Sequence, residues 1–248
     1  MNYSHPLRRG FMLLMALIAT SMGHAAQTQS SFTEDVEKRV MVLTNALRKE
    51  QGLQPLQSEP RLTDAARYFA GYVAKTDKLD HDADGSTPAD RVKTRGYSYC
   101  IIAENLASEY NSAGFTPERL AGNFVEGWSK SPTHRANMLE PEVTQVGVGI
   151  AAGAQSGEYY AVQVFGRPMS QMVRFRVTNR STQTIRYEYR KRTVALAPKQ
   201  IRSHESCVAG ELKFEWPRQQ QPSAVRPKDG DRVTIVEAGP GTYKVIQE

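Results

Sequence analysis

Residues 123–149 of this 248-residue chain read NFVEGWSKSPTHRANMLEPEVTQVGVG and contain a helix, a second helix start and the beginning of a strand. Leu120, Phe124 and Trp128 recur at every fourth position, a spacing that predicts a helix with one buried face. The apolar Val-Gly-Val-Gly run at the end favours a strand. A helical element followed by a strand predicts a mixed fold for this part of the chain.

The second helix begins at Ser131-Pro132, because Ser is a good N-cap and Pro suits the first helical position. His134 then lies in the first helical turn, where the partial positive charge of the free N–H groups disfavours an imidazolium. We predict that His134 is neutral, and that Glu126 on the preceding helix faces the same cleft. A neutral imidazole can bind a metal or accept a proton.

This stretch resembles the CAP superfamily (SCP domain), which includes cysteine-rich secretory proteins, venom allergens, plant pathogenesis-related proteins and bacterial secreted relatives. The motifs that carry the resemblance occur in family order at His81, 103–106, 126–139, 146–149 and 160–166. They extend over about residues 34–168. The resemblance implies an α+β fold, a three-layer α-β-α sandwich around an antiparallel sheet.

Local patterns in the same region predict its elements. Apolar residues at helical spacing predict helices over 34–50 and 63–78, and Thr87-Pro88 begins a short helix that ends at Gly96. Two apolar runs at 146–151 and 158–165, joined by a Gly/Ser-rich turn, predict a β-hairpin.

The resemblance also implies a ligand cavity lined by a tetrad of His81, Glu104, Glu126 and His134. Glu104 follows an apolar run, and a carboxylate in such a place needs a partner. Two imidazoles and two carboxylates suit a divalent transition metal, with zinc as the best candidate. The resemblance further places Arg91, Asn105 and Gln163 at this cavity.

Three interpretations of the tetrad stay open. The preferred one is binding of a small hydrophobic, lipid or cell-envelope ligand, with zinc as a candidate cofactor. The second is a metal-assisted, peptidase-like hydrolase in which Glu104 or Glu126 is the general base. In the third, the four side chains only stabilise one another. Whether the protein is an enzyme is not decided by the sequence.

The N-terminus predicts export. Arg8-Arg9 precedes an apolar run over 11–19 and the small residues of Gly23-His24-Ala25, so we predict a signal peptide over 1–25 that is cleaved after Ala25. The run is too short to span a bilayer. A secreted or periplasmic location favours a disulfide between Cys100 and Cys207 over two free thiols. Such a bridge would join the domains predicted over 26–168 and 169–248.

The C-terminal region predicts a small antiparallel all-β accessory domain. Alternating apolar and charged residues mark strands at 173–177, 184–189, 211–216, 231–236 and 242–246. Residues 169–248 carry 15 Lys/Arg and 8 Asp/Glu, a net charge of +7, whereas residues 26–168 have a net charge of −3. An anionic surface is a candidate partner, and export makes nucleic acid an unexpected one. The simpler interpretation is that these charges form the solvent side of half-buried strands.

Overall fold

The structure is a computed structural model that describes the backbone of residues 11–217 and 222–248, and side chains from residue 29 onward except at 218–221. The predicted signal peptide therefore lies outside the residues described in full, and its Arg8-Arg9 pair lies outside them altogether. The chain forms two compact units, one comprising Met1–Tyr97 and Ile102–Gly166 and the other Ser98–Ile101 and Arg167–Glu248. Among the described residues, no helix is both long enough and apolar enough to cross a membrane.

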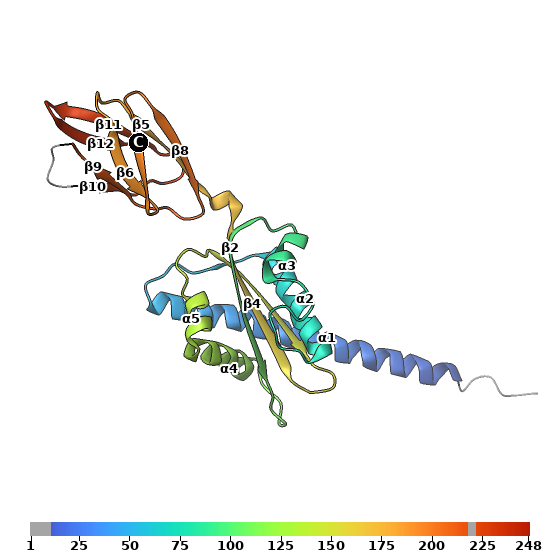
Figure 1. The fold of residues 1–248 in the computed structure, drawn as a ribbon. Coiled ribbons are helices and arrows are strands. Elements are labelled where there is room, and N and C mark those ends of the chain that lie inside the picture. The colour runs from blue at the N-terminus through green and yellow to red at the C-terminus, as the bar shows by residue number, and fades with distance from the viewer. Residues whose placement is uncertain (1–10, 218–221) are drawn as a thin grey trace, which may run out of the picture. The chain divides into compact units, whose positions relative to one another are not determined.

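The N-terminal unit is an α+β sandwich (Figure 1). Its helices are α1 (Phe11–Glu50), α2 (Pro60–Thr76), α3 (Pro88–Thr94), α4 (Pro117–Lys130) and α5 (Pro132–Met138). Its sheet has the order β1-β3-β4-β2, with β1 (Gln57–Ser58), β2 (Tyr99–Glu109), β3 (Gln145–Ala152) and β4 (Tyr159–Pro168). The helices predicted at 63–78 and 87–96 and the hairpin at 146–165 are confirmed. The helix predicted at 34–50 is the second half of the longer α1.

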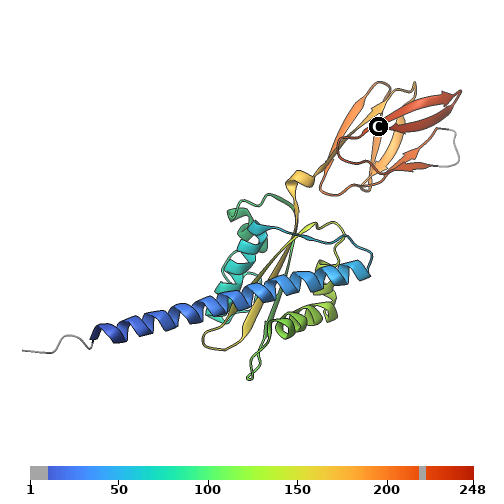
Figure 2. The same cartoon turned by 180° about the vertical axis from the view of Figure 1, so that it is seen from behind.

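Helices cover both faces of this sheet. On β3, Gly147 and Gly149 face α2, and a Cβ added to either would lie 2.2 or 2.3 Å from the backbone of Leu62 or Ala66. The backbone of α2 therefore packs directly on the strand, which only glycine permits. On the opposite face, Gln163 of β4 hydrogen-bonds to α1, which Figure 2 shows in blue, crossing in front of the sheet.

The C-terminal unit consists of two four-stranded sheets, β10-β9-β6-β7 and β12-β11-β5-β8. The first contains β6 (Ile185–Tyr189), β7 (Arg192–Leu196), β9 (Leu212–Glu215) and β10 (Ser223–Val225). The second contains β5 (Val173–Asn179), β8 (Ile201–Ser206), β11 (Arg232–Gly239) and β12 (Thr242–Gln247). A short 3₁₀ helix, η1 (Met169–Gln171), precedes β5. The core between these sheets is built from their alternate residues, among them Phe175, Tyr187, Phe214 and Ile235.

The predicted C-terminal strands are confirmed, with two corrections. The sequence did not predict β7, β8 or β10, because most of their residues are exposed and their alternation is weak. The unit is also not wholly antiparallel, since β11 pairs in parallel with β5. Parallel strands are separated by a long connection in the chain, so the local residue pattern does not predict that they pair.

The disulfide predicted between Cys100 and Cys207 is present, with a Cα–Cα distance of 5.2 Å. It joins the first residues of β2 to the segment that follows β8, 107 residues later in the chain. Because Ser98–Ile101 belongs to the C-terminal unit, both cysteines lie within that unit.

Candidate functional site

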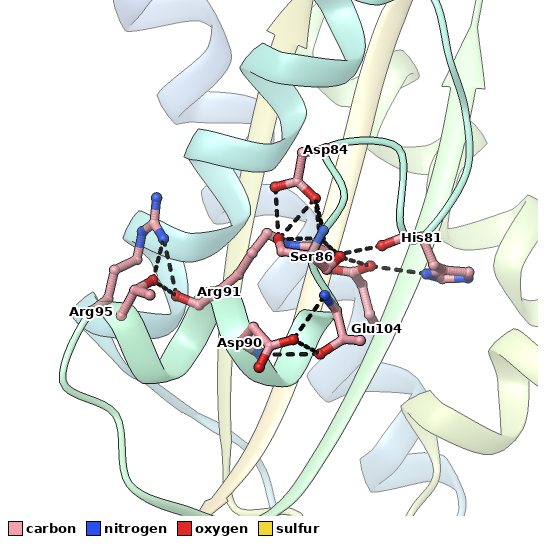
Figure 3. Close-up of polar contacts among 9 residues, drawn as sticks. His81, Asp84, Ser86, Asp90, Arg91, Arg95 and Glu104 are labelled. Carbon is pink, nitrogen blue, oxygen red and sulfur yellow. Dashed lines mark hydrogen bonds and ion pairs between the residues drawn. The ribbon is translucent and has the colours of Figure 1, made fainter.

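Glu104 is the centre of a chain of side-chain contacts between β2, α3 and the loop before α3. Nδ1 of His81 lies 2.9 Å from Oε1 of Glu104, and Nη2 of Arg91 lies 3.0 Å from each carboxylate oxygen (Figure 3). The other terminal nitrogen of Arg91 lies 3.0 Å from Asp84 Oδ1. A carboxylate accepts hydrogen bonds only, so His81 donates from Nδ1 and presents Nε2 as its second nitrogen. The partner that Glu104 was predicted to need is thus both a histidine and an arginine.

Arg91 is held in place by its helix and by an aromatic ring. Thr87 caps α3, and its reciprocal hydrogen bonds with Asp90 fix the first turn, from which Arg91 projects inward. Its guanidinium carbon lies 3.5 Å from the centroid of the Phe69 ring, and the residue is 2% exposed. Nη1 also donates to the backbone carbonyl of Ser86, and Nη2 to that of His81. This arginine therefore fixes the loop that carries His81 as well as the carboxylate that orients it.

His134 lies near His81, and the pKa values of the two imidazoles are shifted in opposite directions. Hydrogen bonding to Glu104 raises the pKa of His81 above its ordinary value, although burial opposes this shift. Burial, and secondarily the charge of His81, lowers the pKa of His134. The predicted neutral His134 is confirmed in direction, but its main cause is burial and not the helix start. The pair offers one imidazole that favours its protonated form and one that favours its neutral form.

A buried amide network lies behind these imidazoles. Nδ2 of Asn105 donates to the carbonyl of His134 at 3.1 Å, and its Oδ1 accepts from Asn137 at 2.9 Å. Asn105 Nδ2 also lies 3.5 Å from Oε1 of Gln163, whose Nε2 donates to Thr44 Oγ1 of α1 at 2.8 Å. Asn105, Gln163 and Thr44 are fully buried. The network ties α5, and so His134, to β2, β4 and α1.

Arg48 fixes the far end of α5. Its side chain is 1% exposed, and Nη1 donates to the carbonyls of Met138 and Glu140 at 2.8 and 2.9 Å. These carbonyls lie at the C-terminal end of the helix, where free acceptors favour a cation. The position of His134 is therefore set from both ends of α5.

Glu126 stands apart from the other three tetrad residues. Its side chain is 63% exposed and forms an ion pair with Lys130, one turn further along α4. Among the described residues, no hydrogen bond or ion pair joins its carboxylate to His81, Glu104 or His134. The buried face of α4 contains Phe124 and Trp128, and the indole N–H of Trp128 donates to the carbonyl of Leu106. The sequence predicted that Glu126 faces the same cleft as His134, whereas α4 directs its carboxylate to solvent.

The donor set does not fit a zinc ion. In the part of the chain that the structure describes, no three His, Cys, Asp or Glu side chains are placed to hold a metal together. Both oxygens of Glu104 accept hydrogen bonds from Arg91, and Glu126 is directed away. Two imidazoles alone fall short of the three protein ligands usual at catalytic zinc. We therefore derive no step through a metal.

Some residues of the site were not predicted from the sequence. Asp84 lies in an acidic loop seven residues before Arg91, and its carboxylate is occupied by Ser86 and Arg91. Asn137, Thr44 and Arg48 are polar residues on otherwise amphipathic helices. The sequence shows only that a polar residue occupies a helical position expected to be buried. It does not show which residue that side chain contacts.

Arg91 also lines a recess that does not include His81. It has a volume of about 570 Å³ and is lined by Tyr68, Asp84, Ser86, Asp90, Arg91, Thr94 and Arg95. Arg95 lies over the ring of Tyr68, with its guanidinium carbon 4.3 Å from the ring centroid. The lining combines polar and charged groups with the Tyr68 ring and the aliphatic parts of the arginine side chains, and more of it is apolar than polar.

Comparison with known proteins identifies the family. The model of the cysteine-rich secretory protein family, CAP, matches residues 41–165. The uncharacterized protein YkwD of Bacillus subtilis is 36% identical over 132 residues, which are 53% of this chain and 47% of YkwD. The chain thus spans about half the length of this curated relative.

Solved structures are similar to part of the chain at lower identity. An extracellular SCP-domain protein from Bacillus anthracis is 22% identical, with a TM-score of 0.49 over 57% of this chain and 43% of its own. NaASP2, solved with Zn²⁺, is 14% identical, with a TM-score of 0.42 over 54% of this chain and 80% of its own. All these matches cover little more than half of the chain.

Proposed function

Because the chain belongs to the cysteine-rich secretory protein (CAP) family, we propose that it is an exported protein whose N-terminal unit binds a small cell-envelope ligand at His81, Glu104 and His134. The observation that carries this proposal is the chain of contacts from Arg91 through Glu104 to His81. It fixes one edge of the imidazole and presents the other, Nε2, to a ligand. The side chain of His81 is half exposed, so this edge is accessible.

The two imidazoles suggest which part of a ligand they recognise. The raised pKa of His81 makes it the stronger hydrogen-bond donor of the pair, and the lowered pKa of His134 makes that imidazole the better acceptor. The nearby recess offers the side chains of Asp84, Ser86 and Asp90, although more of its lining surface is apolar than polar. These features favour a hydrogen-bonding group, such as a sugar or a lipid headgroup, over an acyl chain. Of the ligand classes predicted from the sequence, the polar part of an envelope component therefore fits this cleft best.

The test is native mass spectrometry of the full chain with two probes, soluble muropeptides and phosphatidylglycerol in detergent micelles. We expect the protein to retain one probe, and the His81→Gln/His134→Gln variant to lose it. Glu126→Gln is the matched control, because it changes a tetrad residue that lies outside the cleft, and it should retain the probe. Equal retention by the double variant, or retention of neither probe by the unaltered protein, would contradict the proposal.

A second candidate is hydrolysis, favoured specifically by the His81–Glu104 pair. When His81 is neutral, the Glu104 carboxylate holds the proton on Nδ1 and leaves Nε2 as a general base for water, an arrangement common in acid–base catalysis. Because the pKa of His81 is raised, this reaction requires a pH above that pKa. In this version the base is His81, whereas the sequence suggested Glu104 or Glu126. The same spectra test it, since hydrolysis replaces the muropeptide by two fragments whose masses together equal that of the muropeptide plus one water. An unchanged muropeptide after prolonged incubation would exclude this candidate for that substrate.

A further inference from the structure

The outer face of the sheet β12-β11-β5-β8 carries three clustered arginines. Arg174 and Arg176 alternate on β5 with the buried Val173, Phe175 and Val177 and are both exposed. Arg232 is the register partner of Arg176 on the parallel strand β11. Neighbouring strands lie about 4.8 Å apart, so all three side chains start from adjacent positions on one face.

These arginines line a recess of about 360 Å³, hereafter the arginine recess. Ser203 and Glu205 of β8 line its far side and are the register partners of Arg176 and Arg174. Asp231 lines it at the start of β11. This volume is at the lower end of the range usual for small-molecule sites, about 300–1,000 Å³.

The lining of the arginine recess has a net charge of +1, because Arg174, Arg176 and Arg232 are accompanied by Glu205 and Asp231. Glu205 lies 3.5 Å from Arg174, and both side chains are more than half exposed, so this pair is weak. Oδ2 of Asp231 accepts hydrogen bonds from the backbone of Lys228 and from the amide of Gln247. In the part of the chain that the structure describes, Arg176 and Arg232 have no carboxylate partner. Two adjacent unpaired guanidinium groups repel each other, and a bound anion would relieve this repulsion.

The other sheet of the same unit shows the contrasting arrangement. On its outer face, Arg186 is the register partner of Glu215, and Glu188 is the partner of Lys213. There the charges alternate across neighbouring strands, as expected for a solvated surface. The simpler interpretation of the basic charge therefore suits this sheet and does not suit the arginine recess.

We propose that the arginine recess binds the phosphate group of a phosphorylated sugar or polyol. A planar carboxylate is matched by one guanidinium fork, whereas a tetrahedral phosphate can accept hydrogen bonds from two forks that are not coplanar. Phosphate alone would leave much of the volume empty, and the hydroxyl of Ser203 provides a neutral group for a ligand hydroxyl. The site belongs to the C-terminal unit and does not depend on the proposed function of the cleft.

The experiment is a titration of the full chain with glycerol 3-phosphate, inorganic phosphate and glycerol at constant ionic strength. Calorimetry measures the affinity for each compound, and NMR detects changes in the arginine Nε–Hε signals. We expect glycerol 3-phosphate to bind more tightly than inorganic phosphate, glycerol not to bind, and the signals of Arg176 and Arg232 to shift. The NMR measurement uses the unaltered protein, so its result does not depend on whether a variant folds.

Variants complete the test. Arg176→Gln/Arg232→Gln should weaken binding about tenfold or more, because charge-assisted hydrogen bonds are lost. Arg186→Gln/Arg192→Gln removes the same charge from the other sheet and should change the affinity by less than about twofold. His81→Gln should bind normally. Equal losses in both arginine double variants, shifts confined to other arginines, or no preference for the ester over inorganic phosphate would overturn the proposal.

Discussion

The guanidinium of Arg91 contacts both carboxylate oxygens of Glu104 at 3.0 Å, and both side chains are 2% exposed. A buried ion pair contributes little net stability compared with an apolar pair, but removal of one partner leaves an uncompensated charge. In this protein the same carboxylate also orients His81. Stability and the orientation of His81 therefore depend on the same carboxylate.

Arg91→Leu is expected to lower the free energy of unfolding by about 3–5 kcal/mol, because Glu104 and Asp84 would lose their buried cation. Chemical denaturation measures this change. The control is Arg95→Leu, which removes a neighbouring arginine that lies over the exposed ring of Tyr68. This substitution should lower the free energy of unfolding by less than about 1 kcal/mol. Similar losses in the two variants would mean that burial of the ion pair is not the cause.

The two cleft histidines should titrate on opposite sides of the ordinary histidine pKa of about 6.5. His81 should titrate above it and His134 below it, as followed by NMR of their ring protons. Since the folded pKa of His81 is raised, its contribution to stability is complete below about pH 6.5 and is lost as the pH rises through the folded pKa. In His81→Gln, this loss of stability on the alkaline side should disappear. Two coincident titrations near pH 6.5 would contradict the described geometry.

Gly149→Ala should destabilise the N-terminal unit by about 1–3 kcal/mol or more, because the added Cβ would lie 2.3 Å from the backbone of Ala66. Neither the strand nor α2 can move away without separating the layers. Gly122→Ala is the control, since no atom lies within 4 Å of its added Cβ and alanine favours the helix. It should be neutral or slightly stabilising in the same thermal unfolding measurement. A tolerated Gly149→Ala would show that the layers are not in direct backbone contact.

Removal of the disulfide by Cys100→Ser/Cys207→Ser is expected to lower stability by about 2–5 kcal/mol, because the bridge closes a long loop in the unfolded chain. Reduction of the unaltered protein should produce the same loss, and the double variant should not respond to reductant. A reductant effect that persists in the variant would point to a different cause.

Chelation should leave the unfolding temperature unchanged, and micromolar zinc should not bind stoichiometrically, because no three donors converge among the described residues. Metal analysis and a zinc titration of the purified protein measure this. Stoichiometric zinc that disappears in His81→Ala/His134→Ala would show instead that the imidazoles recruit a further ligand on binding.

The local sequence was sufficient for the helices α2 to α5 and for the strands whose residues alternate clearly. The spacing of Leu120, Phe124 and Trp128 determined the buried face of α4, and Pro132 determined the start of α5; Ser131 occupies the N-cap position, but its side chain forms no cap hydrogen bond. Both depend on contacts within one or two turns of the chain. The disulfide could be predicted too, because two cysteines allow only one intramolecular pair.

Tertiary structure decided which side chains meet. Glu126 lies two residues from Trp128, about 200° around the helix, so burial of the indole directs the carboxylate to solvent and toward Lys130. The link from Asp84 through Arg91 to Glu104 joins a loop, a helix and a strand. No spacing in the sequence encodes that link, because it exists only once the helices pack on the sheet.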